Sequence, residues 1–346
     1  GKEINAEVSA VVGLDENLYV FGGDPPTNEC WVYYYDSNTW ESLPPMKEKR
    51  RLCRAVFVDD KIYVTGGYNN EKRGLASIEV FDCRTLLWTL GPTMINAHSH
   101  HASVTVDGYI YIFGGRDNNF DFTNKCERWN TTSNTSECWT ELPEMPYKAE
   151  GCAAVVKDDK IYVMGGYNAT NKYLDTVVVF DIKTTSWTKQ YTMNTPRFNA
   201  AAILYDNKIC IVGGQSSHYP KTFESSVEVW SEEEEEFIIN NSLVLTIPKS
   251  SFGILITSKQ QLLAIGGNNK STEHKGSSLL QRIDNNTTQY SLECAKNAVS
   301  SNGKYIGYLG FDDFKETVLD FVKQDGNNLG ETNIKWRKDR DVVLAA

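Results

Sequence analysis

The stretch DDKIYVMGG at residues 158–166 decides the fold of this chain. Two acidic residues, which favour a tight turn, lead into a run of β-branched and aromatic residues that ends at a pair of glycines. The same pattern returns as DDKIYVTGG at residues 59–67 and as DNKICIVGG at residues 206–214. Glycine permits backbone conformations and close approaches that a β-carbon would block. Each copy therefore predicts a hairpin whose second strand ends at the glycine pair, where the backbone turns or another segment of the protein comes close to it.

Glycine pairs divide the whole chain into units of about 50 residues, with spacings of 44, 48, 51, 48 and 53. A period of this size predicts one supersecondary unit used repeatedly. The pairs are Gly22-Gly23, Gly66-Gly67, Gly114-Gly115, Gly165-Gly166, Gly213-Gly214 and Gly266-Gly267. An aromatic residue marks each unit a second time: Trp40, Trp88, Trp139, Trp187, Phe237, Tyr290 and Trp336. The last unit has Tyr308-Leu309-Gly310 in place of a pair, so seven units can be counted.

Each unit contains enough strand-like sequence for four strands. In the fourth unit, residues 153–156 are small and apolar, as an inner strand near a propeller axis requires, and 160–164, 176–181 and 186–188 follow. The sequence therefore predicts an all-β propeller with about seven four-stranded blades, six regular and one degenerate. At this length a propeller is one closed domain, here residues 1–346.

The repeated residues resemble the kelch-repeat family, most of all the kelch domains of BTB-Kelch (Kelch-like) adaptor proteins. They are the glycine pair, an aromatic-Asp pair before the Trp (Phe81, Asp82 and Trp88) and a Pro-Met after it (Pro45-Met46). Such adaptors usually have six blades, so the seventh unit implies either a seven-bladed ring or irregular packing of that unit. The run at residues 342–344 either ends the last blade or crosses to the first.

Composition narrows the possible functions. A net charge of −10 and a pI of about 5.1 argue against nucleic-acid binding, which needs a basic field. No run of eighteen apolar residues predicts a membrane span, and no signal peptide is visible. We expect a cytoplasmic protein of which this chain is a fragment. The acidic run Glu232–Glu236 is interpreted as a solvated turn.

Eight cysteines show no spacing typical of a metal site, and no metal or cofactor is predicted. Several lie inside apolar strands, where Cys acts as a small hydrophobe. Cys126 and Cys138 flank one predicted hairpin and would pair in an oxidising compartment. Asn-x-Ser/Thr triplets, for example at Asn130 and Asn168, keep a secreted origin open.

Function is expected on one face of the ring. In a four-stranded meander, the loop before the first strand (the inner-strand loop) and the loop after the glycine pair (the glycine loop) lie on the same face, here called the loop face. The predicted partner-binding residues in glycine loops are Tyr68, Arg116, Phe120, Tyr167 and Tyr219. Those in or near inner-strand loops are Arg50, Arg51, Arg54, His98, His100, His101, Lys148, Arg197, Asn199 and Phe252.

The resemblance implies that residues in and near the inner-strand loops line a central pocket, where Arg would hold the carboxylates of an acidic peptide. The alternative is structural: the charged residues are solvated or bond carbonyls of the neighbouring blade, and Tyr68 and Tyr167 pack at blade edges. On the pocket hypothesis, replacing both Arg50 and Arg197 by Ala abolishes peptide binding without unfolding the ring.

Three functions remain open. The first is a protein-interaction domain that recruits a partner or degron peptide for a cullin-type ubiquitin ligase, through domains outside this sequence. The second is an actin-binding or cytoskeletal scaffold. The third is a secreted propeller like galactose oxidase or sialic-acid epimerases, in which Glu150 beside Lys148 and His101 would supply acid–base chemistry. We expect no catalysis and no copper site, because His98, His100 and His101 form a single loop cluster.

Overall fold

The structure is a computed structural model that describes residues 10–14, 17–34, 37, 39–69, 71, 74–132, 138–170, 172–256, 261–268, 280–283, 305–307, 334–336 and 342–344. The chain divides into two compact units, residues 1–35 with 40–284, and residues 36–39 with 285–346. Regular structure in the described ranges consists of strands. A helix with the length and apolarity to cross a membrane is not found in these ranges.

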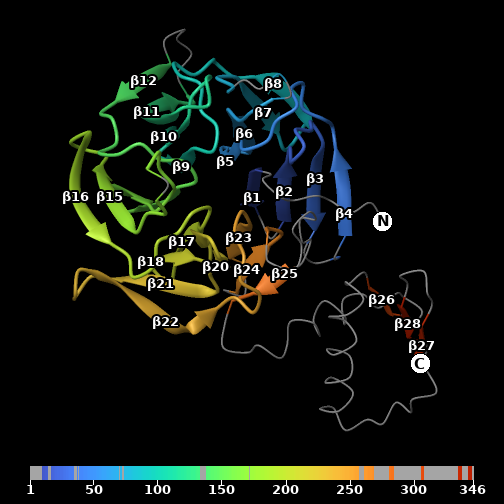
Figure 1. Ribbon diagram of the computed structural model, residues 1–346. Helices are drawn as coiled ribbons and strands as arrows, with labels where there is room; N and C mark the ends of the chain where they lie inside the picture. Colours follow the sequence, from blue (N-terminus) through green and yellow to red (C-terminus); the bar gives the residue numbers. More distant parts are fainter. Residues whose placement is uncertain are drawn as a thin grey trace. The chain divides into compact units, whose positions relative to one another are not determined.

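The first unit contains five four-stranded antiparallel sheets followed by a three-stranded one (Figure 1). Blade 1 consists of β1 (Ala10–Leu14), β2 (Asn17–Phe21), β3 (Cys30–Tyr34) and β4 (Thr39–Leu43). Blade 2 consists of β5 (Arg54–Val58), β6 (Lys61–Thr65), β7 (Ile78–Asp82) and β8 (Leu87–Leu90). Blade 3 consists of β9 (Ala102–Val106), β10 (Tyr109–Arg116), β11 (Phe122–Asn130) and β12 (Trp139–Leu142).

Blade 4 consists of β13 (Ala153–Lys157), β14 (Lys160–Met164), β15 (Thr176–Asp181) and β16 (Ser186–Thr192). Blade 5 consists of β17 (Ala201–Tyr205), β18 (Lys208–Val212), β21 (Ser226–Ser231) and β22 (Glu236–Val244), with the extra hairpin β19 (Gln215–His218) and β20 (Lys221–Phe223). Blade 6 consists of β23 (Gly253–Ile256), β24 (Leu262–Ile265) and β25 (Leu280–Arg282). The predicted hairpins and inner strands are confirmed.

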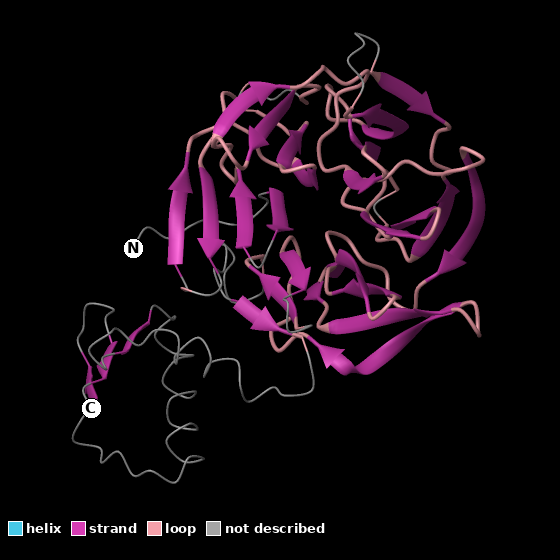
Figure 2. Cartoon of the chain, turned by 180° about the vertical axis from the view of Figure 1, so that it is seen from behind, coloured by secondary structure: helices cyan, strands magenta, loops and turns pink. Residues whose placement is uncertain are grey.

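Six sheets close the ring of the first unit. Each inner strand contacts the next in the order β1, β5, β9, β13, β17 and β23, and β23 contacts β1 again. Figure 2 shows this ring of strands from behind. Blades 1 and 6 share a core that includes Leu18, Val20 and Leu255. A β-carbon on Gly253 would lie 2.3 Å from a methyl carbon of Val11, so this contact requires glycine.

The prediction of about seven blades is therefore corrected for the described residues, in which five blades have four strands and a sixth has three. The fourth strand expected near Tyr290 lies outside the described residues. In the second unit, β26 (Tyr305–Gly307), β28 (Val342–Leu344) and β27 (Ile334–Trp336) form a sheet in that spatial order. The run at 342–344 thus lies between two strands of the last repeat, which is not a simple meander.

Apolar residues fill the spaces between neighbouring blades. In β15, Val178 and Phe180 pack toward blade 3, whereas Val177 and Val179 pack toward blade 5. Strands covered on both faces read as continuous apolar runs, which explains the sequence pattern. Burying each such side chain contributes roughly 1.5–3 kcal/mol.

The repeated Trp and Pro also join neighbouring blades. The indole N–H of Trp88 in blade 2 donates to the carbonyl oxygen of Pro44 at 2.7 Å. Trp187 makes the same bond to Pro143 at 3.0 Å. The repeat is therefore a device for holding one blade against the previous one.

The glycine pair is required by the next blade. Gly66 has φ +54°, and a β-carbon there would lie 2.1 Å from the carbonyl oxygen of His98. Its neighbour Gly67 donates its N–H to the same oxygen at 2.8 Å. Only glycine lets the two backbones approach this closely.

Two interpretations of local sequence can be compared with the structure. Cys126 and Cys138, which would pair only in an oxidising compartment, are both free and belong to cores on opposite faces of blade 3. The interpretation of the acidic run as a solvated turn is confirmed, because residues 232–235 form an exposed turn. Glu232 also pairs with Lys157 of blade 4.

Candidate functional site

The two loop families meet on one face, as predicted. In blade 2, Arg51 of the inner-strand loop and Tyr68 of the glycine loop exchange backbone hydrogen bonds of 3.0 and 2.8 Å. Glu150 and Tyr167 make the same exchange in blade 4 at 3.0 and 2.9 Å. The loop face is therefore held by backbone pairing as well as by side chains.

A chain of backbone hydrogen bonds links successive inner-strand loops around the ring. Each donor N–H lies 2.8–2.9 Å from the carbonyl oxygen of the equivalent residue in the previous blade, and each residue has a positive φ of 53–64°. The residues are Leu52, His100, Gly151, Asn199 and Ser251. His100 and Asn199, predicted to bind a partner, thus have a structural role at this position.

Arg50 lies inside the wall between blades 1 and 2 and is 0% exposed. Its Nη1 donates to the carbonyl oxygens of Gly66 and Ser77 at 2.7 and 3.0 Å. Its Nη2 pairs with Glu79 at 3.1 Å. Glu79 in turn accepts two backbone N–H groups of the preceding linker, at 2.6 and 3.0 Å. The backbone N–H of Arg50 donates to the carbonyl oxygen of Thr27 in blade 1 at 2.9 Å, so Arg50 joins blade 1 to blade 2.

The arrangement recurs around the ring. Arg197 is also 0% exposed and bonds Gly213 at 2.6 Å and Glu228 at 3.0 Å. The buried ring of His98 bonds the carbonyl oxygen of Gly114 at 2.8 Å and Glu127 at 3.0 Å. We call each of these buried basic–acidic pairs, with its glycine carbonyl, an inter-blade clamp.

One position lacks the clamp because both partners are apolar. Ala149 stands where the other loops have Arg or His, and Val178 stands in β15 where Glu79 and Glu228 stand in their strands. Both belong to the core between blades 3 and 4. The chain thus replaces the two members together, as expected for a charge pair that is costly to break.

The binding prediction for Arg50, His98 and Arg197 is corrected, because their polar groups are buried and used between blades. The structural alternative fits these three with one difference, because the glycine carbonyls that they bond belong to the blade that each loop enters. His101 is also 0% exposed and bonds Thr65 at 2.8 Å. Burial lowers the pKa of His101 well below its usual value, so it is neutral at pH 7.

In blade 6 the basic residue stands one position earlier. Lys249, 17 residues before the first glycine of the pair instead of 16, donates to the Gly266 carbonyl oxygen at 2.9 Å. Burial lowers the pKa of this lysine to about 7. Phe252, predicted to bind a partner, packs against the core between blades 5 and 6.

Glu150 is the centre of a second polar network. It accepts hydrogen bonds from Arg116 at 2.5 and 2.8 Å and pairs with His100 at 3.0 Å. Burial raises the pKa of Glu150, but these two partners outweigh it and lower the pKa to about 2. Glu150 is a permanent carboxylate at pH 7, which does not suit it to be the acid–base group considered above.

The other predicted cations differ in availability. Arg51 pairs with Asp24 at 2.9 Å. Arg54 is half-buried and donates to the carbonyl oxygen of Cys53 at 3.4 Å. Lys148 is exposed. Much of the expected positive charge is therefore neutralised by the chain itself.

Aromatic side chains form the most extensive feature of the loop face. Neighbouring ring centroids stand 4.7–6.3 Å apart, and the Arg116 guanidinium lies over Phe120 and Phe122 at 4.5 and 3.9 Å. We call this set, which crosses blades 2 to 5, the aromatic arc: Tyr68, Phe120, Phe122, Tyr167, Tyr173, Phe198, His218 and Tyr219. The structure thus brings the predicted Tyr68, Phe120, Tyr167 and Tyr219 together.

The arc ends on the β19–β20 hairpin of blade 5. Tyr219 at its tip is 92% exposed. The hairpin is tied to blade 4 through Tyr173, whose hydroxyl bonds His218 at 3.0 Å and accepts from Gln215 at 2.8 Å. A rigid hairpin that presents an exposed Tyr is typical of a recognition element.

Sequence reasoning missed Phe122, Tyr173, Phe198 and His218 as members of the arc. Phe198 follows Arg197 directly, and its ring lies 5.2 Å from His100. A search for aromatic residues next to the predicted basic residues of the inner-strand loops would have found Phe198. Tyr173 gives no such signal, because its approach to blade 5 is purely tertiary.

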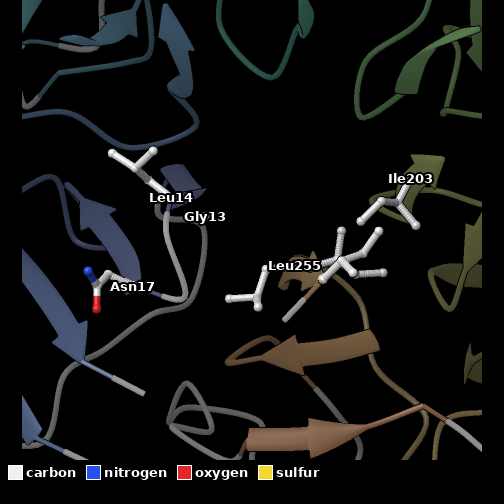
Figure 3. A pocket seen from close by; sticks show the side chains of 7 residues that line it. Gly13, Leu14, Asn17, Ile203 and Leu255 are labelled. Carbon is white, nitrogen blue, oxygen red and sulfur yellow. The ribbon is translucent and has the colours of Figure 1, made fainter. Parts of the chain in front are cut away.

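A pocket of about 230 Å³ lies at the opposite end of the inner strands, away from the glycine loops. Leu14, Ile203 and Leu255 give it an aliphatic lining beside Asn17 (Figure 3). None of the predicted site residues lines it. Within the described residues, no group of His, Cys, Asp or Glu is arranged to hold a metal ion.

The six-sheet ring with glycine-paired blades defines a kelch-type β-propeller. The KLHDC2/KLHL20/DRC7 Kelch-repeats domain model matches residues 7–214 and 100–292. The chain belongs to this family, and Kelch-like and BTB-Kelch proteins are among its relatives.

Several relatives are about one quarter identical to this chain over the residues that align. Beta-scruin of Limulus polyphemus is 26% identical over 72% of this chain and 29% of its own length. Kelch-like protein 38 of Rattus norvegicus is 27% identical over 54% and 32%. Kelch repeat and BTB domain-containing protein 1 of horsepox virus is 27% identical over 64% and 41%. The chain thus spans less than half the length of these relatives.

The fold is also that of a solved structure. The structure of YjhT covers 81% of this chain, and 95% of its own chain is matched, with a TM-score of 0.69. At 15% identity this likeness concerns the fold alone.

Proposed function

We propose that this chain is the partner-binding domain of a larger adaptor and that it recruits a protein through the aromatic arc. The observation that carries the proposal is the arc itself, a set of rings that runs from the buried Tyr68 through half-buried rings to the exposed His218 and Tyr219. The Arg116 guanidinium bridges Phe120 and Phe122 within it. Tyr and Arg are the residues that dominate binding energy at protein interfaces. Membership of the kelch-repeat family supports a protein-interaction role.

The adaptor proposal extends to a cullin-type ubiquitin ligase, with this chain recruiting the substrate. It is supported by the relatives whose names join kelch repeats to a BTB domain, and by the part of their length that this chain spans. The BTB part would lie outside this sequence. An actin-binding scaffold is the alternative, with contacts on outer strands instead of the arc.

The proposal does not rely on catalysis. The one carboxylate considered for acid–base work, Glu150, is held ionised by Arg116 and His100. Nor does it rely on Arg50 and Arg197, whose replacement removes inter-blade clamps and tests folding instead of binding. If the ligand were an acidic peptide, Arg54 and Lys148 would be the predicted cations left to bind its carboxylates.

The test is affinity capture with the full-length protein from cells. Tyr219→Ala removes the exposed end of the arc without touching the core. The matched control is Leu87→Ala on outer strand β8, where the leucine is 64% exposed. We expect the unmodified protein and both variants to capture a cullin. We expect a further partner to be captured by the unmodified protein and by Leu87→Ala, but not by Tyr219→Ala. Partners unchanged by Tyr219→Ala, together with co-sedimentation on actin filaments, would favour the scaffold alternative.

A further inference from the structure

The charge of the aromatic arc restricts the chemistry of what it binds. Arg116 uses Nε and Nη2 on Glu150 and donates from Nη1 to the carbonyl oxygen of Phe120 at 2.8 Å. Arg51, whose guanidinium lies 5.3 Å from the Tyr68 ring, is paired with Asp24. The two guanidinium groups that lie over arc rings are thus neutralised within the chain. These two guanidinium groups therefore do not select a carboxylate-rich peptide, although the Lys221 amine lies on the hairpin at the end of the arc.

The shape and exposure of the rings favour a rigid, extended ligand. Tyr167, Tyr173 and Phe198 are half-buried, so part of each ring is uncovered. Their planes are tilted to one another by 59–86°, so the rings do not stack flat against one another. Pro-rich segments in the polyproline II conformation dock on aromatic surfaces of this kind and lose little conformational entropy on binding.

Hydrogen-bond donors accompany the rings. A polyproline II segment has no internal hydrogen bonds, so its carbonyl oxygens need donors from the partner. The hydroxyl of Tyr219 stands at the hairpin tip, and Lys221 follows at a position where its amine lies 5.1 Å from the Phe223 ring. Aromatic faces with a few donors beside them are the complement of an uncharged, proline-rich chain.

We propose that the aromatic arc binds an uncharged, proline-rich segment of the partner in an extended conformation. This inference rests on the proposed function and names the chemistry of the partner at the same site. The β19–β20 hairpin forms one end of the site, because its tip projects Tyr219 beyond the half-buried rings. Specificity then comes from ring contacts, and binding depends only weakly on salt, unlike recognition of an acidic peptide.

The experiment is selection of random 12-residue peptides displayed on phage against the full chain, with counter-selection on Tyr219→Ala. We expect the enriched peptides to contain prolines spaced by three residues and to carry little charge. A synthetic copy of the most enriched peptide should bind at least tenfold more weakly to Tyr219→Ala, by fluorescence polarisation, and equally well to Leu87→Ala. Replacing its prolines by alanine should cause a similar loss.

The outcomes separate this inference from the proposed function. Peptides that depend on Tyr219 but are acidic or lack proline overturn the inference and leave the arc as a binding site. Peptides that bind Tyr219→Ala as well as the unmodified chain, or no enrichment over that variant, overturn both. Affinity that falls more than tenfold between 50 and 500 mM salt also overturns the inference, because it would reveal a charged ligand.

Discussion

The clamp between blades 4 and 5 allows a direct test of how the ring is held together. Arg197 and Glu228 are both 0% exposed, and their charged groups lie 3.0 Å apart. Glu228 also accepts the backbone N–H groups of Asn194 and Thr195 at 2.7 and 3.0 Å. Changing Arg197→Ala leaves a buried carboxylate, and changing Glu228→Val leaves a buried guanidinium. Each single change should cost about 3–5 kcal/mol of unfolding free energy.

The double variant copies what the chain already has at Ala149 and Val178. It removes both charges, so what remains is the loss of packing, about 2–5 kcal/mol. The losses of the two single variants add to about 6–10 kcal/mol, which exceeds the loss expected for the double variant. The double-mutant cycle should therefore show a coupling energy of several kcal/mol between Arg197 and Glu228.

Urea unfolding followed by tryptophan fluorescence at pH 7 measures all four proteins. Where a single variant does not fold, Glu228→Gln keeps the shape and removes only the charge. The control is the exposed pair Lys189 and Glu235, whose side chains are 52% and 63% exposed and whose removal should cost at most about 1 kcal/mol. Single losses below about 1 kcal/mol, or losses that simply add in the double variant, would refute the clamp.

Three further predictions concern single groups. Because the pKa of Glu150 is lowered to about 2, its carboxylate contributes fully to the free energy of unfolding above pH 4.5, and this contribution is lost as the pH falls through 2. Glu150→Gln should therefore lower the free energy of unfolding by roughly 2–3 kcal/mol at pH 6 and flatten the acid limb of a stability–pH curve. An unchanged limb would contradict this. Gly66→Ala should destabilise by more than about 2 kcal/mol in urea unfolding. Gly108→Ala should cost only about 1 kcal/mol, because φ there is +75° but the nearest atom to the new β-carbon lies at 3.8 Å, an ordinary contact; equal losses would exclude the backbone clash as the cause. Among the described cysteines, Cys83 should react first with a thiol reagent in the folded protein, since the other six are buried. In urea the other six should react as well. If the seven thiols do not react even after unfolding, the protein is oxidised, which would indicate a secreted protein.

Local sequence was sufficient for the blade. The run at residues 160–164 is a strand because its β-branched and aromatic residues are covered on both faces, and the glycines that end it are needed by a close backbone approach. These are properties of neighbouring residues, so a single sequence reveals them. The number of blades depended on contact between the two ends of the ring. That contact, through Gly253 and Val11, joins residues more than 240 positions apart, and the repeat pattern does not encode where the ring closes.

The chemistry of the charged residues was decided by tertiary structure. Arg50, His98 and Arg197 look like loop cations in the sequence. One acidic partner of Arg50 is close in the chain, Glu48 at 3.0 Å. Their shared type of acidic partner lies 29–31 residues later, on the third strand of the blade that the loop enters, and becomes a neighbour only when that blade folds. The sequence by itself determined a kelch propeller with a loop face that carries aromatic residues. Only the packed ring decided that the cations are buried in its wall and that the rings of four blades meet in one arc, because burial is set by the neighbouring blade and not by the residue's own repeat.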